Sequence, residues 1–431
     1  MINKYNRNLF INFKMSKRSR SSDQTNDPEY SRYFKKLSRK EQRELGEIEH
    51  QLTDYNLKIT PIRYQILTIN MPIDKKAHVM SLYTQFNSME PNNSEYFHYK
   101  RRLDGILAIP WGIIKSLPVT LDDGYDNIKT FLDDSRNHLN KTTYAHKTAK
   151  EKILGKIAQI LVNPEHQSMV LGIKGPPGCG KTTIIHDGIA KILDRPFFTV
   201  NLGGARDTCM LKGSNPVWDK STWGKIVQIL ISAKCMNPII YFDELCKISG
   251  SVHGKEISDA LCNLIDPKLN HSFHDDYLGI SIDVSKVLFI FSYNNEDNVD
   301  RVLLDRMDII GCDGYSIDDK IQILDNYMLP ILLDKIHLHK DDIKITDNIV
   351  KHIIKKYANK EEGVRELNRC VDTILTKINL LRLSDPKSFE KHFAEMSHPR
   401  LQSKTKKKNK KTNGSSSGME LTIKMVDEFL S

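Results

Sequence analysis

The sequence has no apolar run near the roughly 18 to 20 residues that a membrane-spanning helix needs. It also has no two cysteines at C-x-x-C spacing, and its seven cysteines are an odd number. These absences argue against a membrane protein, a zinc ribbon and a disulfide scaffold, and they favour a reducing compartment. There is no internal repeat. We therefore expect 431 residues to form a soluble, intracellular, cytoplasmic protein of two or three domains.

Acidic residues are absent from two stretches that hold the whole surplus of positive charge. Residues 1–20 carry six basic side chains and residues 400–411 carry seven, and neither stretch contains Asp or Glu. Because the net charge of the whole chain is only +10, the remainder is close to neutral and slightly acidic. A basic groove for nucleic acid within the fold is therefore disfavoured. We expect binding to nucleic acid or to an acidic partner to come from the tails.

The first 45 residues are polar and rich in Ser, Lys and Arg, which predicts a disordered basic tail over residues 1–45. Four apolar residues between Leu9 and Phe13 are interleaved with this basic segment. That pattern is also typical of an organelle presequence. A start of translation at Met15 is a third interpretation.

In the rest of the chain the spacing of apolar residues changes twice. Residues 46–135 have apolar residues at helical spacing, interrupted by prolines, and are predicted to form a helical neck domain. Residues 136–315 read as short apolar strands alternating with helices, which is typical of an α/β domain with a parallel sheet. Residues 316–431 are predicted to form a small helical domain. The basic insert at 399–418 is expected to be an exposed loop, because it has no apolar residue from Gln402 to Gly418.

Three short apolar runs, rich in β-branched or aromatic residues, are the predicted buried strands: Met169–Ile173, Pro238–Phe242 and Val287–Phe291. A short strand-plus-helix pattern at Leu421–Leu430 ends the chain.

The segment GPPGCGKT fits the phosphate-loop pattern G-x-x-x-x-G-K-[ST] in full, between an apolar run and a predicted helix over Thr183–Leu193. Backbone N–H groups of such a loop wrap the phosphates of a nucleotide, and the helix N-terminus adds positive potential. Lys181 would reach the β- and γ-phosphates, and the Thr182 hydroxyl would bind Mg²⁺. Cys179 is interpreted as a passive filler of the loop rather than a redox switch. The predicted nucleotide contacts are Gly175, Pro176, Pro177, Gly178, Cys179, Gly180, Lys181, Thr182 and Thr183.

Polar residues follow the second and third predicted strands. In PIIYFDE, Asp243 would hold Mg²⁺ and Glu244 would act as general base toward the attacking water. In VLFIFSYN, Asn294 would orient that water between Glu244 and the γ-phosphate. A loop-capping role is the alternative interpretation of Asn294.

Many further segments resemble the ATPase part of Lon-type proteases, a branch of the AAA+ family. The resemblance covers residues 60–431 and is interrupted by the basic insert. The matching segments, in family order, are MPIDKKAHVMSLYTQFNSMEPNNSEY (71–96), RRLDGILAIPWG (101–112), KTTYAHKTAKEKIL (141–154), GGARD (203–207), DELCKI (243–248), LIDPKLNHSFHDDYL (264–278), SKVLFIFSYNN (285–295), LLDRMDIIGCDGYS (303–316), GVRELNR (363–369) and MELTIKMVDEFL (419–430).

The resemblance implies an AAA+ P-loop domain with a parallel sheet, a C-terminal helical lid and a preceding helical neck. It implies ATP and Mg²⁺ as cofactors and a homo-oligomeric, hexameric ring. Tyr144 would contact adenine, Asn294 would be sensor 1 and Arg365 sensor 2. Arg306 would be the arginine finger that reaches ATP in the neighbouring subunit, and Trp218 the aromatic pore-loop residue. Surface salt bridges are the alternative for both arginines, and a buried core position for Trp218.

Two departures from the family pattern limit what the resemblance implies. The chain ends at Ser431, where the Lon peptidase domain would begin, so no catalytic nucleophile is assigned. The family's proline-rich stretch before the finger is replaced by VDRV at 299–302. We expect an ATP-driven unfoldase or remodeller of polypeptides, alone or with a separate peptidase. An ATP-gated scaffold and a nucleic-acid-associated ATPase are the alternatives.

Overall fold

The computed structural model describes residues 32–57, 60–92, 94–163, 169–204, 207–218, 221–248, 252–384 and 419–431. They belong to two compact units, Met1–Gln65 and Ile66–Ser431. The basic segment 1–20 and the insert at 399–418 lie outside the described residues.

The first unit contains helix α2 (Arg39–Leu57). A capping box starts this helix: the Ser38 amide and hydroxyl donate to Glu41 Oε2 at 2.9 and 2.6 Å, and the Glu41 amide donates back to Ser38 Oγ. The helix therefore begins inside the tail predicted to be disordered over residues 1–45. That prediction is wrong for residues 39–45, because the box supplies partners for the first helical N–H groups.

Helices α4 (Ile73–Asn87) and α5 (Ser94–Ala108) form the neck of the second unit and pack against each other. Helix α3 (Ile62–Thr68) lies across the boundary between the units. Two arginines attach α5 to the α/β domain: Arg101 donates to Thr222 Oγ1 at 3.2 Å, and Arg102 Nε donates to the Leu278 carbonyl at 2.9 Å.

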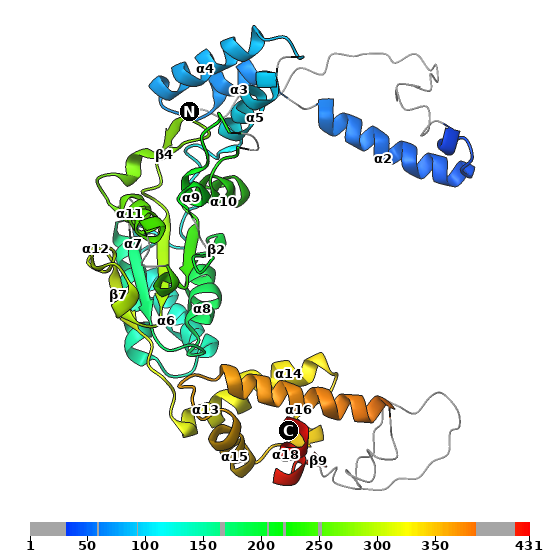
Figure 1. The fold of residues 1–431 in the computed structure, drawn as a ribbon, viewed down its shortest axis with the longest axis vertical. Helices are drawn as coiled ribbons and strands as arrows, with labels where there is room; N and C mark the ends of the chain where they lie inside the picture. The colour runs from blue at the N-terminus through cyan, green and yellow to red at the C-terminus, as the bar shows by residue number, and fades with distance from the viewer. Residues whose placement is uncertain are drawn as a thin grey trace. The chain divides into compact units, whose positions relative to one another are not determined.

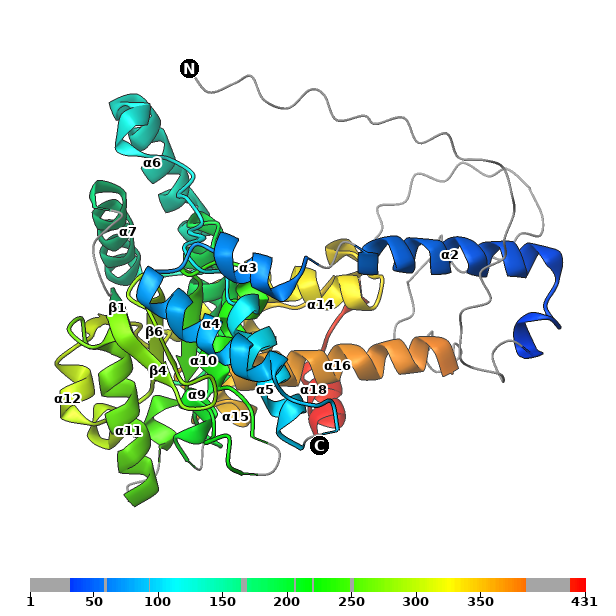
Figure 2. The same ribbon diagram turned by 90° about the horizontal axis from the view of Figure 1, so that it is seen from above.

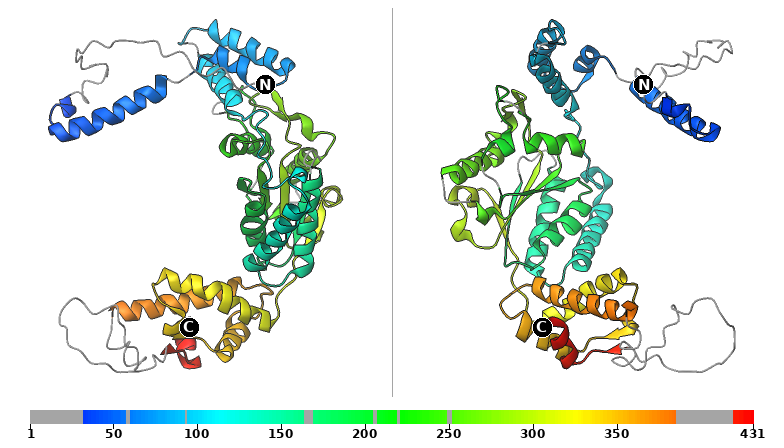
Figure 3. Two further views of the ribbon diagram at one scale, coloured as in Figure 1. Left: turned by 180° about the vertical axis from the view of Figure 1, so that it is seen from behind. Right: turned by 45° about the vertical axis from the view of Figure 1, so that its right-hand side comes forward.

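A five-stranded sheet in the order β2-β3-β6-β1-β7 forms the centre of the α/β domain, and its neighbouring strands pair in parallel. Each predicted apolar run overlaps one of its strands, and the predicted α/β fold class is confirmed. In Figure 3 the strands run between helices on either side. The strands are β1 (Val170–Lys174), β2 (Phe197–Asn201), β3 (Ile239–Asp243), β6 (Leu288–Tyr293) and β7 (Asp308–Gly311).

One face of the sheet packs against α6 (Tyr125–Thr142), α7 (Lys147–Val162) and the π-helix η2 (Ile184–Ala190), and their buried side chains form a single core cluster. Figure 2 shows α6 and α7 side by side. Because α6 begins within residues 46–135 yet packs on the sheet, the predicted boundary at 135/136 is wrong. Apolar spacing alone did not show which domain this helix would cover.

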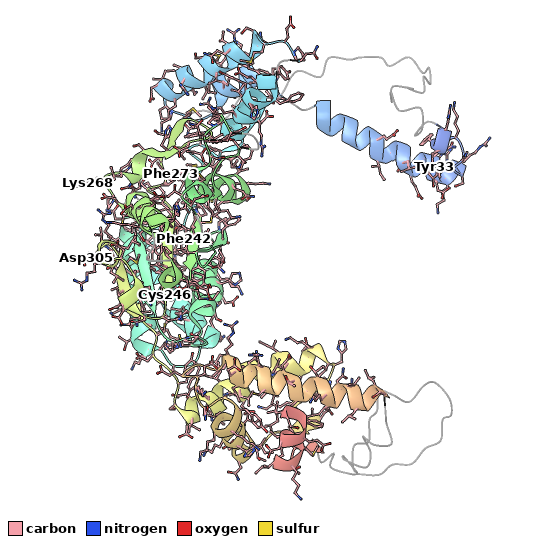
Figure 4. All side chains as sticks on the ribbon, viewed as in Figure 1. Tyr33, Phe242, Cys246, Lys268, Phe273 and Asp305 are labelled. Atoms are coloured by element: carbon pink, nitrogen blue, oxygen red, sulfur yellow. The ribbon has the colours of Figure 1, made fainter. Side chains whose placement is uncertain are left out.

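Side chains alternate between the two faces of a strand, so Tyr241 and Phe242 of β3 point in opposite directions. Tyr241 joins the cluster beneath η2, whereas Phe242 stacks on Phe291 of β6 with ring centroids 4.9 Å apart. In Figure 4 Phe242 lies inside the domain, while Lys268 and Asp305 lie at its outer edge.

The shorter elements of the second unit connect these parts. The predicted helix over Thr183–Leu193 is helical in the structure: the last residue of α8 (Lys181–Thr183) is followed by the π-helix η2. The remaining elements before the lid are η1 (Leu121–Asp123), α8 (Lys181–Thr183), α9 (Cys209–Lys212), α10 (Lys225–Ala233), η3 (Leu245–Lys247), α11 (Val252–Ile265), η4 (Asn270–Ser272), β4 (Phe273–Asp275), β5 (Ile280–Ile282), η5 (Glu296–Asn298) and α12 (Arg301–Leu304).

The lid follows β7 and is mostly helical (Figure 1). Its last segment returns to the lid core after the insert: β9 pairs with β8 in parallel, and Val426 is fully buried. Asp427 accepts hydrogen bonds from Tyr357 at 2.9 Å and faces His352 at 2.8 Å. The lid elements are α13 (Ile317–Ile323), the π-helix η6 (Leu324–Met328), α14 (Leu329–Lys335), η7 (Lys340–Asp342), β8 (Ile343–Lys344), α15 (Asp347–Tyr357), α16 (Arg365–Ser384), β9 (Met419–Glu420) and α18 (Ile423–Leu430).

None of the helices in the described part of the chain combines the length and the apolar content needed to cross a bilayer.

Asp275 fixes the turn between β4 and β5. Its side chain is fully buried and accepts three backbone N–H groups, from Gly224 at 2.8 Å, Leu278 at 2.8 Å and Tyr277 at 3.1 Å. One carboxylate thus joins the hairpin to the loop that precedes α10.

We predict that Asp275→Ala destabilises the protein strongly, because it leaves three N–H groups without their acceptor. At about 1 kcal/mol or more for each, the free energy of unfolding should fall by at least about 3 kcal/mol. Urea unfolding measures this change. Asp318→Ala, at a side chain that is 89% exposed, is the control and should cost less than about 0.5 kcal/mol. Equal stability of the two variants would contradict the structural role of Asp275.

Candidate functional site

The phosphate loop leaves the carboxyl end of β1 and enters α8 at Lys181. Gly178 and Gly180 have φ angles of 75° and 86°, in the left-handed region that glycine adopts without strain. The Lys181 ammonium donates to the carbonyls of Gly175 at 2.6 Å and Pro176 at 2.9 Å, and to Asn294 Oδ1 at 2.9 Å. The loop therefore places its one lysine beside the end of β6, as expected for a group that contacts a terminal phosphate.

Asp243 and Glu244 lie at the carboxyl end of β3. Asp243 Oδ1 accepts hydrogen bonds from Tyr241 at 2.9 Å, from the Glu244 amide at 3.0 Å and from the Ser292 hydroxyl. Glu244 has a φ of 61°, which is uncommon for a residue with a side chain. Its Oε1 forms an ion pair with Lys247 Nζ at 2.5 Å. The backbone is therefore strained at the residue that carries this carboxylate, and such strain is frequent at functional sites.

A cavity of about 750 Å³ brings most of the predicted site residues together. This volume is within the usual range for a small-molecule or cofactor site. Side chains of the lid, among them Tyr327, Ile331 and Asn368, complete the wall opposite the α/β domain. The predicted residues that line it are Tyr144, Pro177, Gly178, Gly180, Lys181, Thr182, Thr183, Asp243, Glu244, Asn294 and Arg365.

Three loop residues lie elsewhere. Gly175 and Pro176 line a second cavity of about 1370 Å³ behind the loop. Cys179 is fully buried. A hydrogen bond from the Cys312 side chain, together with the nearby Lys181, lowers the pKa of Cys179 below its ordinary value.

Two residues that sequence reasoning missed hold the loop from behind. The Tyr315 hydroxyl donates to the Cys179 carbonyl at 2.8 Å, and His146 Nε2 lies 2.9 Å from the same oxygen. Burial lowers the pKa of His146 and raises that of Tyr315, so both side chains are neutral near pH 7. No local pattern could have identified them, because their partner is distant in sequence.

The lid contacts the phosphate loop directly. The Val364 amide donates to the Gly178 carbonyl at 3.1 Å, and a Cβ on Gly363 would lie only 2.2 Å from the Pro177 carbonyl oxygen. The next residue, Arg365, begins α16 and lines both cavities. A glycine at 363 is what lets the lid backbone come this close.

Arg306 does not line the cavity of its own chain. It forms an ion pair with Asp266 at 2.8 Å and donates to the Cys262 carbonyl at 3.0 Å. Its side chain remains 33% exposed. The guanidinium is thus held at the surface of the α/β domain, away from the site that its own chain builds.

Trp218 and Val217 are 71% and 87% exposed, so the alternative of a buried core tryptophan is wrong. The loop that carries them is anchored from within. The hydroxyl oxygen of the buried Ser221 lies 2.6 and 2.5 Å from the carbonyl oxygens of Asn215 and Trp218, which share its one proton. An exposed apolar pair is thus presented on a fixed turn.

The site fits ATP with Mg²⁺. In the described part of the chain no group of three His, Cys, Asp or Glu side chains could hold a metal by itself. Asp243 and Thr182 line the cavity together, however, and Asp243 Oδ2 has no hydrogen-bond partner among the described residues. Mg²⁺ usually binds through one or two protein ligands plus substrate phosphates, which suits this pair.

Comparison with known proteins matches two parts of the chain to family models. Residues 171–312 match the ATPase family associated with various cellular activities (AAA), and residues 334–389 match the Lon protease AAA+ ATPase lid domain.

The chain is also similar to proteins of a virus, a bacterium and a eukaryote. A Lon protease homolog of Acanthamoeba polyphaga mimivirus is 33% identical over 360 residues, which is 81% of this chain and 34% of the relative. Lon protease of Chlamydia trachomatis is 34% identical over 296 residues, 69% of this chain and 34% of the relative. The mitochondrial Lon protease homolog of Kluyveromyces lactis is 34% identical over 298 residues, which is 69% of this chain and 26% of the relative. The chain therefore spans about a quarter to a third of the length of these relatives.

We predict that Lys181→Ala weakens nucleotide binding by about tenfold or more. A hydrogen bond to a charged group is worth about 1.5 to 3 kcal/mol, and this variant removes the ammonium that would contact the phosphates. Fluorescence anisotropy of a labelled ATP analogue gives the dissociation constant. Lys268→Ala, at an exposed lysine (Figure 4), is the control and should bind as the wild type does. If Lys181→Ala bound the nucleotide as tightly as the wild type, the nucleotide could not be bound beside Lys181 in this cavity.

Proposed function

Because the chain carries a Lon-type AAA+ ATPase module, we propose that it hydrolyses ATP and uses the energy to unfold or remodel polypeptides as a ring. One observation carries the hydrolysis: Lys181, Asp243, Glu244 and Asn294 meet in one cavity, at the carboxyl ends of three neighbouring strands. That edge of a parallel sheet is where open α/β folds bind their ligands.

The chemistry follows from the positions of the side chains. Bound Mg²⁺ would neutralise charge that develops on the phosphates, and Thr182 and Asp243 would hold it. Lys181 contacts the terminal phosphates from the loop. Glu244 takes the proton of the attacking water, and Asn294 orients that water from the end of β6. Arg306 of the neighbouring subunit and Arg365 of the lid add positive charge near the γ-phosphate.

The lid couples hydrolysis to movement. Val364 and Arg365 follow each other in the chain, and the first bonds the phosphate loop while the second lines the cavity. A change at the γ-phosphate therefore reaches the lid through adjacent residues. In a ring, movement of the lid displaces the α/β domains and the loops that they carry.

Val217 and Trp218 would grip the polypeptide. Large exposed side chains on an anchored turn suit contact with an extended chain, because apolar contact does not require a particular sequence. We assign no peptidase role to any of the 431 residues, and a separate peptidase is a possible partner of such a ring. Binding of nucleic acid or an acidic partner remains a prediction for residues 1–20 and 400–411, outside the described residues.

We predict that Glu244→Gln preserves ATP binding and lowers turnover by about two orders of magnitude or more, because the amide cannot accept the proton of the water. A phosphate-release assay and the ATP dissociation constant measure the two effects separately. Glu256→Gln, on an exposed part of α11, is the matched control. An ATP-gated scaffold would function equally well with either variant, whereas turnover at the wild-type rate in Glu244→Gln would show that the base is misassigned.

We predict that subunits with Arg306→Ala and subunits with Glu244→Gln, each inactive alone, regain part of the ATPase activity when mixed. A mixed ring contains interfaces where an intact Glu244 faces an intact Arg306 of the next subunit. Activity is measured across mixing ratios, with ring formation checked by light scattering.

The control is Arg301→Ala, at an exposed arginine on α12, which should be active alone. Complete inactivity at every ratio, in rings shown to contain both variants, would exclude a finger that acts between subunits.

A further inference from the structure

Tyr241 lies in the middle of β3, between the buried core residues Ile240 and Phe242. Its ring is fully buried and stacks on Phe197 of β2, with centroids 5.8 Å apart and planes 25° apart. It points toward the face of the sheet that the phosphate-loop helix covers. The phenol hydroxyl therefore ends beneath the loop, next to the predicted metal ligands.

The hydroxyl contacts both of those ligands. It donates to Asp243 Oδ1 at 2.9 Å, and it lies 3.3 Å from Thr182 Oγ1. Tyr241 has one hydroxyl proton, and that proton is used toward Asp243. The Thr182 hydroxyl must then be the donor in the second contact, with the Tyr241 oxygen as acceptor.

This chain of hydrogen bonds determines which electron pairs remain for a metal. A serine or threonine hydroxyl that binds a cation uses a lone pair, so its proton needs an acceptor elsewhere, and Tyr241 supplies one. At Asp243, three donors occupy Oδ1, while Oδ2 has no hydrogen-bond partner among the described residues.

We propose that Tyr241 is a positioning residue for Mg²⁺: its one hydroxyl accepts from Thr182 and donates to Asp243, and so turns one lone pair of each ligand toward the metal. This inference rests on the ATPase function proposed above and deepens it. Tyr241 touches neither nucleotide nor metal and acts only through the two ligands.

The expected effect is specific to the metal. Partners that hold metal ligands from behind typically contribute 10- to 100-fold to metal affinity. Ser292 and the Glu244 amide still hold Asp243 in Tyr241→Phe, so we expect the lower end of that range, about tenfold. Phenylalanine keeps the ring, its stacking on Phe197 and its volume, so folding should be preserved.

The test uses the full chain and a fluorescent ADP analogue. Its dissociation constant is measured in EDTA, and the Mg²⁺ concentration that gives half of the metal-dependent increase in affinity is measured by titration. For Tyr241→Phe we expect an unchanged constant in EDTA, a Mg²⁺ midpoint about tenfold higher, and ATPase activity that recovers at high Mg²⁺. The melting temperature is recorded for each variant.

Tyr277→Phe is the matched control. Tyr277 is also fully buried, but its hydroxyl has no hydrogen-bond partner in the described part of the chain, and it lies outside the cavity. Its removal should leave both the Mg²⁺ midpoint and the affinity in EDTA as in the wild type.

Two results would overturn the inference. One is a Mg²⁺ midpoint in Tyr241→Phe equal to that of the wild type. The other is a shift that occurs only together with a lower melting temperature and weaker binding in EDTA, because a general structural role would produce it. If the wild type itself shows no Mg²⁺-dependent nucleotide binding, the proposed ATPase function fails as well, so the two failures are distinguishable.

Discussion

The site depends on the parallel pairing of β6 with β1 on one side and with β3 on the other. The pairing Phe242↔Phe291 places Asp243 beside Ser292, and the pairing Lys174↔Tyr293 places the start of the phosphate loop beside Asn294. A shift of one residue in either register would turn these side chains to the other face. The core of Phe242, Phe289 and Phe291 rings and the cluster beneath η2 prevent such a shift by filling both faces of the sheet.

The second constraint is the contact between lid and phosphate loop. The Tyr315 amide donates to the Glu362 carbonyl at 2.9 Å, and Lys320 Nζ donates to the Glu361 carbonyl at 2.5 Å. These bonds hold the segment before Gly363 against the start of the lid, where the chain leaves the α/β domain. The same short segment therefore contacts the start of the lid on one side and Gly178 on the other. A ligand that rearranges the phosphate loop therefore changes the hydrogen bonds of the lid directly, because the two segments are in contact.

Local patterns in the sequence predicted three of the five strands of the sheet, the phosphate loop and the lid, because each of these leaves a signal within a few neighbouring residues. Strands β2 and β7 were not predicted. Helix α2 could also have been predicted from the sequence, because Ser38 and Glu41 have the spacing of a capping box. The assignment of α6 to the α/β domain could not have been predicted, because amphipathic spacing does not show which surface a helix covers. The roles of Tyr241, His146 and Tyr315 were missed for a related reason. Their partners are far away along the chain, and a tyrosine in an apolar strand looks like any other core residue. Exposure of Trp218 likewise depends on how its loop is anchored, which Ser221 alone does not reveal.

We propose that ATP is hydrolysed by a ring of these subunits that acts on polypeptides. Specific ATPase activity measured across a wide range of protein concentrations, with and without an unfolded polypeptide, tests it most directly. The account predicts low activity per subunit in dilute solution, a rise as subunits assemble and complete each other's sites with Arg306, and a further increase when the unfolded polypeptide is added. Activity per subunit that is the same at every concentration and indifferent to the polypeptide would contradict it.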